Sequence, residues 1–166
     1  SESKQAEGEQ DILVDRSREG IALVTLNRPA RLNALSQSAV RRLCAAIDAL
    51  AQDDSVRVLV VTGAGRGFCA GWDLGSAFTR RDGQPVEGEP TLADLMAGQE
   101  LFAGMVRRLR ALDKVVITAV NGVAVGAGFA LTLRAGVRVA ATSTSDGVMP
   151  ASTMRCSSIS SPYSEK

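Results

Sequence analysis

The fold is decided by Arg66-Gly67-Phe68-Cys69-Ala70-Gly71-Trp72-Asp73-Leu74 and by a second glycine-rich stretch, Asn121-Gly122-Val123-Ala124-Val125-Gly126-Ala127-Gly128-Phe129. Each stretch follows an apolar, β-branched run, and the second continues into a helix-like run. A glycine-rich turn at such a junction lets the backbone bend sharply and leaves amide N–H groups without partners. Two such turns brought together would form a pair of backbone donors, which is an arrangement that stabilises an oxyanion on a carbonyl substrate.

The composition of the chain is that of one globular domain with a core. Its 166 residues are 45% hydrophobic and 22% charged, and the net charge is +1. This near-neutral balance gives no support for nucleic acid or an anionic membrane as a partner. No apolar run approaches transmembrane length, and residues 1–10 do not resemble a signal peptide. Three widely spaced cysteines, Cys44, Cys69 and Cys156, fit a reducing compartment, so we expect a cytoplasmic protein.

Histidine is absent from the chain. This excludes Ser-His-Asp and Cys-His catalysis and the usual histidine-rich zinc or iron sites. We therefore expect no metal centre, and any acid–base chemistry must fall to Asp, Glu, Tyr, Lys, Cys or water.

Hydrophobic periodicity predicts alternating strands and helices, and hence an α/β fold. Strands are expected at residues 12–14, 21–26, 56–62, 115–120 and 137–140, and helices at residues 37–52, 92–112 and 127–133. Ser36 is the predicted N-cap of the first helix, and Thr91 with Asp94 resembles a capping box before the second. The run at residues 56–62 is continuously apolar, which predicts a strand buried on both faces.

Three regions differ in composition. Residues 1–10 are polar and are predicted to form a flexible tail, whereas residues 11–141 carry the apolar periodicity of a core. Residues 142–166 contain eight Ser and three Thr and lose that periodicity, so we interpret them as a disordered or non-native tail. Within the core, the polar segment 78–90 is a candidate mobile loop or lid.

Three ordered motifs resemble those of the crotonase, or enoyl-CoA hydratase/isomerase, superfamily. The first is Leu26-Asn27-Arg28-Pro29 followed by Leu32-Asn33-Ala34-Leu35, and the second is the apolar run 58–63 followed by residues 68–74. The third is Ala119-Val120-Asn121-Gly122 followed by Gly126-Ala127-Gly128. The resemblance covers residues 12–141. It implies a spiral of repeated ββα units that is incomplete at its C-terminal end, by truncation or frame shift after about Ala141.

The resemblance also implies a chemistry. Crotonases bind an acyl-CoA thioester and stabilise its enolate in a two-amide oxyanion hole, whose donors by position are the N–H groups of Trp72 and Ala127. The positions that match the family's contacts with CoA are Arg31, Leu32, Ala34, Ala70, Gly71 and Gly126. Coenzyme A enters as part of the substrate, so no separate cofactor is implied. The family belongs to fatty acid metabolism and forms trimers or hexamers, which implies self-association of this chain.

Several of these residues also have a purely structural interpretation. Arg31 fits a contact with a CoA phosphate and an exposed loop arginine about equally well. Asp73 is expected to cap a helix, and Cys69 to be a small buried residue rather than a nucleophile. The turn at residues 126–128 could open a dinucleotide site, but Leu131 stands where that fingerprint requires Gly or Ala. The Leu and Met stripe at residues 92–112 is expected to belong to the core.

The resemblance breaks at the catalytic carboxylates. The hydratases of this family use two glutamates, and the first of these positions is Ala130 here. The second falls in residues 146–151, which contain Asp146 but no Glu. Three explanations remain open: a fragment or frame-shifted product of an enzyme, a crotonase relative that needs only enolate stabilisation, or a non-catalytic acyl-CoA-binding or interaction module. In each case we expect hydration of a 2-enoyl-CoA to be absent or very slow.

Overall fold

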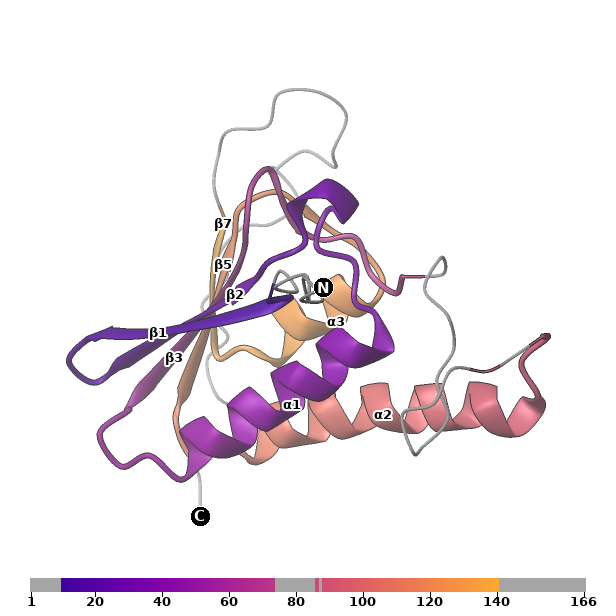
Figure 1. Cartoon of the computed structure of the whole chain (residues 1–166). Coiled ribbons are helices and arrows are strands. Elements are labelled where there is room, and N and C mark those ends of the chain that lie inside the picture. Colours follow the sequence, from indigo (N-terminus) through magenta and orange to yellow (C-terminus); the bar gives the residue numbers. More distant parts are fainter. Residues whose placement is uncertain (1–9, 74–85, 87, 141–166) are drawn as a thin grey trace, which may run out of the picture.

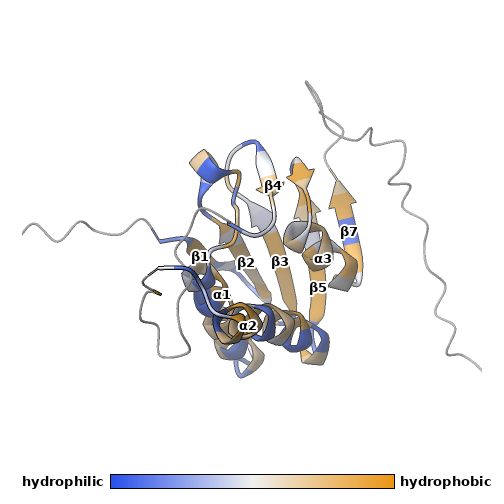
Figure 2. Cartoon of the chain, turned by 90° about the vertical axis from the view of Figure 1, so that its right-hand side faces the viewer, coloured by the Kyte–Doolittle hydropathy of each residue, from blue (hydrophilic) through white to orange (hydrophobic). Residues whose placement is uncertain are grey.

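The molecule is built on a five-stranded sheet with helices on one side. The computed structural model describes residues 10–73, 86 and 88–140. The sheet contains, in spatial order, β1 (Ile12–Arg18), β2 (Ile21–Leu26), β3 (Val58–Gly63), β5 (Val115–Val120) and β7 (Val137–Ala140). Figures 1 and 2 show that α1 (Gln37–Ala51), α2 (Leu92–Ala111) and α3 (Ala127–Arg134) cover the same face of this sheet.

A second sheet completes the repeat. It consists of two short parallel strands, β4 (Gly67–Cys69) and β6 (Val123–Ala124). The element order is therefore β1-β2-α1, β3-β4-α2 and β5-β6-α3, followed by β7, with a short 3₁₀ helix, η1 (Pro29–Arg31), before α1. This is the predicted spiral of ββα units. The strands β4 and β6 were not among those predicted from hydrophobic periodicity, and they supply the second strand of the second and third units.

The strand register gathers the three motifs at one edge of the large sheet. Strands β2, β3, β5 and β7 are parallel, and Leu26 pairs with Gly63 while Thr62 pairs with Ala119. The carboxyl ends of β2, β3 and β5 therefore lie side by side, and each is followed at once by one of the motifs. In open α/β sheets, ligands bind at the carboxyl ends of the strands. Strand β1 pairs antiparallel with β2 and extends to Arg18, beyond the predicted residues 12–14.

Helix α1 follows its prediction closely. The Ser36 hydroxyl oxygen accepts a hydrogen bond from the Ala39 N–H at 3.1 Å, which is the N-cap expected from the sequence. The apolar side chains at helical spacing are buried; they are Val40, Leu43, Cys44, Ile47 and Leu50. This face packs against the sheet and α2, so local capping and core burial specify the same helix.

Helix α2 begins with the predicted capping box. The Asp94 N–H donates to the Thr91 hydroxyl at 3.3 Å, and the Thr91 N–H donates to the Asp94 carboxylate at 3.0 Å. The predicted core stripe is only partly confirmed. Met105 is buried, but Leu95 and Met96 are 42% and 64% exposed. The large apolar side chains in the first turns of α2 are therefore mostly exposed.

Burial of the large sheet is one-sided, which corrects the prediction for β3. Leu59 and Val61 are buried under the helices, whereas Val58 and Val60 are partly exposed on the opposite face. We call this opposite side the outer face. Its apolar members are Leu13, Ile21, Leu23, Val58, Val60, Val115, Ile117, Val137 and Val139, and each of them is at least partly exposed. A continuous apolar run in sequence therefore does not mean that both faces are covered within the described part of the chain.

Other predictions concern residues outside the described ranges. The flexible tail predicted for residues 1–10 falls there except for Gln10, and so does the Ser-rich segment 142–166. Most of the predicted loop at residues 78–90 is also outside. Among the described residues, no helix has the length and apolarity needed to cross a lipid bilayer.

Candidate functional site

The turn between β3 and β4 is held by two asparagines from distant parts of the chain. The Asn33 amide donates to the carbonyl oxygens of Ala64 and Gly67 at 2.9 and 2.7 Å. The Asn121 amide donates to the carbonyls of Gly63 and Gly65, both at 2.8 Å, and its oxygen accepts from the Gly63 N–H. These hydrogen bonds satisfy backbone carbonyl and N–H groups that the turn itself would leave unpaired, so the second motif has a defined conformation.

Asn33 also shapes the first motif. Its carboxamide oxygen accepts from the Arg28 N–H at 2.8 Å, which closes the loop around η1. Leu32 and Asn33 both have positive φ angles, 48° and 57°. Asparagine tolerates this left-handed conformation better than most residues, but leucine does not, so the loop stores strain that the hydrogen bonds of Asn33 offset.

The first and second motifs are joined by backbone hydrogen bonds. The Ala70 N–H donates to the Leu32 carbonyl at 2.9 Å, and the Leu35 N–H donates to the Gly71 carbonyl at 2.7 Å. The result is a short parallel bridge between Leu35 and Trp72. The backbone of Trp72 is therefore fixed from one side by the loop that precedes α1.

The third motif reaches the second through very close backbone contacts. The Val125 N–H donates to the Cys69 carbonyl at 3.0 Å. A Cβ atom on Gly128 would overlap that same carbonyl oxygen, and one on Gly122 would overlap the carbonyl oxygen of Arg66. Only glycine permits such an approach of two backbones, so these positions fix the distance between the motifs.

The two glycine-rich turns meet at Gly71 and Gly126. Gly71 has φ +98°, and a Cβ built on it would lie 3.0 Å from the Val125 carbonyl oxygen and 3.6 Å from the Ala127 nitrogen. The predicted juxtaposition of the Trp72 turn with the Ala127 turn is thus present in the backbone. Within the described residues, neither the Trp72 N–H nor the Ala127 N–H donates a hydrogen bond. Ala127 is the first residue of α3, where N–H groups have no partner inside the helix.

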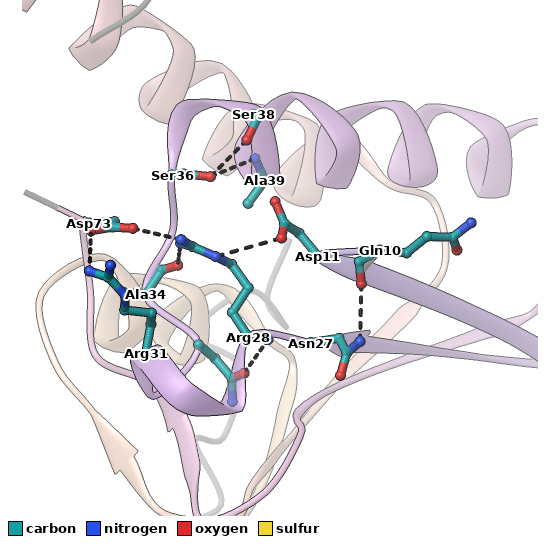
Figure 3. Close-up of polar contacts among 11 residues, drawn as sticks. Gln10, Asp11, Asn27, Arg28, Arg31, Ala34, Ser36, Ser38, Ala39 and Asp73 are labelled. Carbon is teal, nitrogen blue, oxygen red and sulfur yellow. Dashed lines mark hydrogen bonds and ion pairs between the residues drawn. The ribbon is translucent and has the colours of Figure 1, made fainter. Parts of the chain in front are cut away.

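Arg28 ties the first motif to the end of the second (Figure 3). Its guanidinium donates to the Ala34 carbonyl at 2.6 Å and pairs with the Asp73 carboxylate at 2.8 Å. A weaker contact, 3.6 Å long, joins it to Asp11. Asp73 is only 6% exposed, and the ion pair with Arg28 compensates its buried charge. The predicted helix-capping role of Asp73 concerns the residues after it, which lie outside the described ranges.

Arg31 lies at the rim of this network. Its side chain is 63% exposed, and its nearest carboxylate oxygen, on Asp73, is 4.0 Å away. The guanidinium is therefore a cation that a ligand could reach from solvent. Leu32 and Ala34 are partly buried beside it, and so are Ala70 and Ala127 across the two turns, whereas Gly126 is exposed.

Comparison with known proteins identifies the family. Residues 16–153 match the family model described as enoyl-CoA hydratase/isomerase. The chain belongs to the enoyl-CoA hydratase/isomerase family. It is 42% identical over 131 residues to a probable enoyl-CoA hydratase of Mycobacterium leprae, covering 79% of this chain and 44% of that one. It is 40% identical over 133 residues to the 1,2-epoxyphenylacetyl-CoA isomerase of Escherichia coli, covering 80% of this chain and 48% of that one.

Solved structures agree with this family. A probable enoyl-CoA hydratase/isomerase of Mycobacterium abscessus superposes with a TM-score of 0.68 at 38% identity, covering 80% of this chain and 47% of that one. An enoyl-CoA hydratase of Bacillus anthracis gives a TM-score of 0.69 at 30% identity, with coverages of 81% and 48%. The chain thus spans about half the length of the relatives it matches.

Cys69 has the structural role expected for it. The side chain is fully buried in the enoyl-CoA hydratase/isomerase fold, and this burial raises the pKa of its thiol to about 11. A thiol with such a pKa is protonated at neutral pH and is a poor nucleophile. Burial also raises the pKa of the Cys44 thiol, on α1.

Of the two positions at which the sequence resemblance leads us to expect a carboxylate in the hydratases, the first is described and the second is not. Ala130 lies on α3, one turn beyond Ala127, and is partly buried. The methyl group there can neither take nor deliver a proton. Residues 146–151, with Asp146, lie outside the described ranges.

Sequence reasoning missed three residues that position the site: Arg28, Asn33 and Asn121. All three belong to the quoted motifs, but the motifs alone did not reveal their functions. The signal for Asn121 was its place before Gly122, since Asn-Gly marks turns. Nothing in the sequence indicated that Asn33 reaches a turn some 30 residues away.

Proposed function

We propose that the chain binds an acyl-CoA thioester and stabilises its enolate through the N–H groups of Trp72 and Ala127. One observation carries this proposal. Two turns, whose Trp72 and Ala127 N–H groups have no acceptor among the described residues, adjoin at Gly71, where a Cβ built on the glycine would lie 3.6 Å from the Ala127 nitrogen. Membership of the enoyl-CoA hydratase/isomerase family supports the same chemistry.

The chemistry follows from the properties of backbone donors. Removal of a proton from the carbon next to the thioester moves negative charge onto the carbonyl oxygen. Two preorganised N–H groups stabilise that charge, and loss of one such donor typically costs about 3–4 kcal/mol in the transition state. Ala127 adds the positive end of the α3 dipole, which favours an anion at the same point.

We assign the CoA portion of the ligand to the loop that carries Arg31. The exposed Arg31 guanidinium would bind a phosphate of CoA, and the backbone around Leu32 and Ala34 would face the rest of the CoA moiety. Ala70, Gly71 and Gly126 would line the approach to the donors. Coenzyme A is then a part of the substrate, and the proposal requires no metal or separate cofactor.

We further propose that the chain does not hydrate enoyl thioesters efficiently. Ala130 replaces one carboxylate, and a general acid–base group typically contributes about 10²–10⁴-fold to a rate. The second candidate function is a non-catalytic acyl-CoA-binding module, and Ala130 favours this function too. A dinucleotide site is disfavoured, because Leu131 is 2% exposed and fills the core where that fingerprint needs a small residue.

Calorimetry tests the binding proposal. Acetyl-CoA and free CoA should both release heat, whereas a nicotinamide dinucleotide should not. If folded protein gives no heat with either CoA compound, the proposal is wrong.

Crotonyl-CoA hydration, followed by loss of the enoyl thioester absorbance, tests the catalytic part. Wild type should show little or no turnover, and Ala130→Glu should raise the rate above that of the matched control Ala130→Gln. Wild-type turnover at ordinary enzyme rates would refute the assignment of a missing acid–base group.

Self-association is proposed on the same footing. The outer face of the sheet and the exposed Leu95 and Met96 of α2 form apolar surface that normally seeks a partner. Light scattering over a dilution series should show an average molecular mass that decreases as the protein is diluted. A strictly monomeric protein at all concentrations would contradict this proposal. We place the protein in the cytoplasm because Cys44 and Cys69 are both free thiols.

A further inference from the structure

Trp72 is the only tryptophan in the chain, and its side chain connects the proposed donor turn to α2. The indole meets the Phe102 ring edge to face, with centroids 6.4 Å apart and an interplanar angle of 80°. A Cβ built on Gly98, one helical turn before Phe102, would lie 3.7 Å from Cζ2 and 3.9 Å from Cη2 of the indole. The indole therefore rests on the surface of α2 at Gly98.

Gly98 makes this contact possible. Glycine inside a helix costs about 1 kcal/mol relative to alanine, and Gly98 is buried in the 20-residue helix α2. A Cβ here would meet Gln37 Nε2 at 3.2 Å and would only touch the indole, so a side chain longer than that of alanine would be needed to reach the space that the indole fills. The rings of Trp72 and Phe102 together connect the donor turn to α2.

The position of the indole relative to the Trp72 N–H follows from covalent geometry. The Cβ atom of any residue lies about 2.5 Å from its own nitrogen. A thioester oxygen that accepts a hydrogen bond from the Trp72 N–H lies about 2.9 Å from the same nitrogen. The thioester oxygen then lies within about 5.4 Å of the Trp72 Cβ. The indole carried by that Cβ is only partly buried and keeps some surface accessible.

We propose that the indole of Trp72, backed by Phe102 and Gly98, forms the wall of the acyl pocket and restricts the site to short acyl groups. This inference rests on the proposed acyl-CoA binding at the Trp72 and Ala127 donors. An acyl chain that extends toward α2 has to displace a ring already in van der Waals contact with the helix. Each methylene that a pocket fails to accept changes discrimination by about 10–200-fold. The substrate class is therefore short-chain acyl-CoA thioesters.

The experiment combines two signals on the intact chain. Calorimetry with free CoA, acetyl-CoA, butyryl-CoA and octanoyl-CoA measures affinity, and the fluorescence of the single tryptophan reports on the acyl pocket. In wild type, acetyl-CoA and butyryl-CoA should change the tryptophan emission, and free CoA should not. Butyryl-CoA should bind at least tenfold more tightly than octanoyl-CoA.

Variants separate the indole from the fold. Trp72→Ala should raise the affinity for octanoyl-CoA at least tenfold relative to the affinity for butyryl-CoA, and so reverse the chain-length preference. Trp72→Phe should retain the wild-type order of affinities. Leu133→Ala removes a half-exposed apolar side chain from α3 and serves as a control that should leave the order unchanged.

The outcomes distinguish this inference from the function on which it rests. If acyl-CoA thioesters bind by calorimetry but the wild-type emission does not respond, the wall assignment is overturned and the binding proposal stands. An unchanged chain-length order in folded Trp72→Ala has the same meaning. If no CoA compound binds, both proposals fail. The wild-type emission decides the matter even if Trp72→Ala does not fold.

Discussion

The side-chain amides of Asn33 and Asn121 both point their donors at the Gly67 carbonyl oxygen, at 2.7 and 3.5 Å. Asn33 belongs to the first motif, Asn121 to the third and Gly67 to the second. A carbonyl oxygen of the second motif thus accepts hydrogen bonds from the first and the third, and these are the three motifs on which the family resemblance rests. Hydrogen bonds to one backbone oxygen therefore link the three motifs.

Replacement of Asn121 by Ala should lower the free energy of unfolding by about 1–3 kcal/mol, because the partly buried hydrogen bonds to the carbonyls of Gly63 and Gly67 are lost. Asn33→Ala should cost at least as much, because alanine is also less tolerant of φ +57°. Urea unfolding measures both. Asn27→Ala is the matched control, since its amide makes an exposed hydrogen bond to Gln10, and it should change stability by less than about 0.5 kcal/mol. Equal losses in all three variants would contradict the proposed positioning role.

Gly71→Ala should impair ligand binding more than stability. The new methyl group meets the Val125 carbonyl at 3.0 Å and pushes the two turns apart, so acetyl-CoA affinity should fall at least tenfold. Gly88 is a suitable control, because it also has a positive φ, +82°, but a Cβ there contacts nothing within 4 Å. Gly88→Ala should show only the backbone cost, about 1 kcal/mol, and normal affinity by calorimetry.

Arg28→Met should destabilise the protein by about 1–3 kcal/mol, because it removes the 2.8 Å ion pair of the buried Asp73 carboxylate. Arg107 pairs with Glu100 at a similar distance, 2.9 Å, but both side chains are more than 60% exposed. Arg107→Met should therefore change stability by less than about 1 kcal/mol. Thermal or urea unfolding of the two variants should separate a buried pair from a surface pair. Similar losses in the two would mean that the Arg28 network adds nothing specific.

Stability should fall as the pH rises from about 9 to about 11. Burial holds the Cys69 pKa in the folded protein at about 11, above its ordinary value of 9.0, so in this range the unfolded chain loses a proton that the folded chain keeps. One pKa unit corresponds to about 1.4 kcal/mol, which makes the total loss about 3 kcal/mol. Cys69→Ala should unfold with a weaker dependence on pH over this interval. An identical pH dependence in the variant would show that other groups cause it.

Much of the fold is local in origin and was predictable. Ser36 and Thr91 cap helices where their sequences indicate, and the apolar spacing of α1 matches its buried face. The error in β3 has a physical reason. Val58 and Val60 are as apolar as Leu59 and Val61, and a sequence pattern records which residues prefer burial, not whether another layer covers them.

The site was predictable only as a set of motifs. Glycines at 71 and 126 indicated two turns, but their contact depends on the pairing of β3 with β5 and of β4 with β6, which joins residues more than 50 positions apart. The partnership of Arg28 with Asp73 is equally non-local. A single sequence does not show which residues of two distant strands pair with each other.

The dependence of the turn at residues 63–67 on Asn121 also has a consequence for the order of events on the ribosome. Asn33 precedes the turn in the chain, whereas Asn121 follows Gly67 by 54 residues. At about 5–20 residues per second, translation needs about 3–11 seconds to add that interval. During this time the nascent turn has one of its two amide supports, and the second arrives only with the end of β5. The geometry that brings the two glycine-rich turns together is therefore completed only after the residues of α1 and α2 have been synthesised.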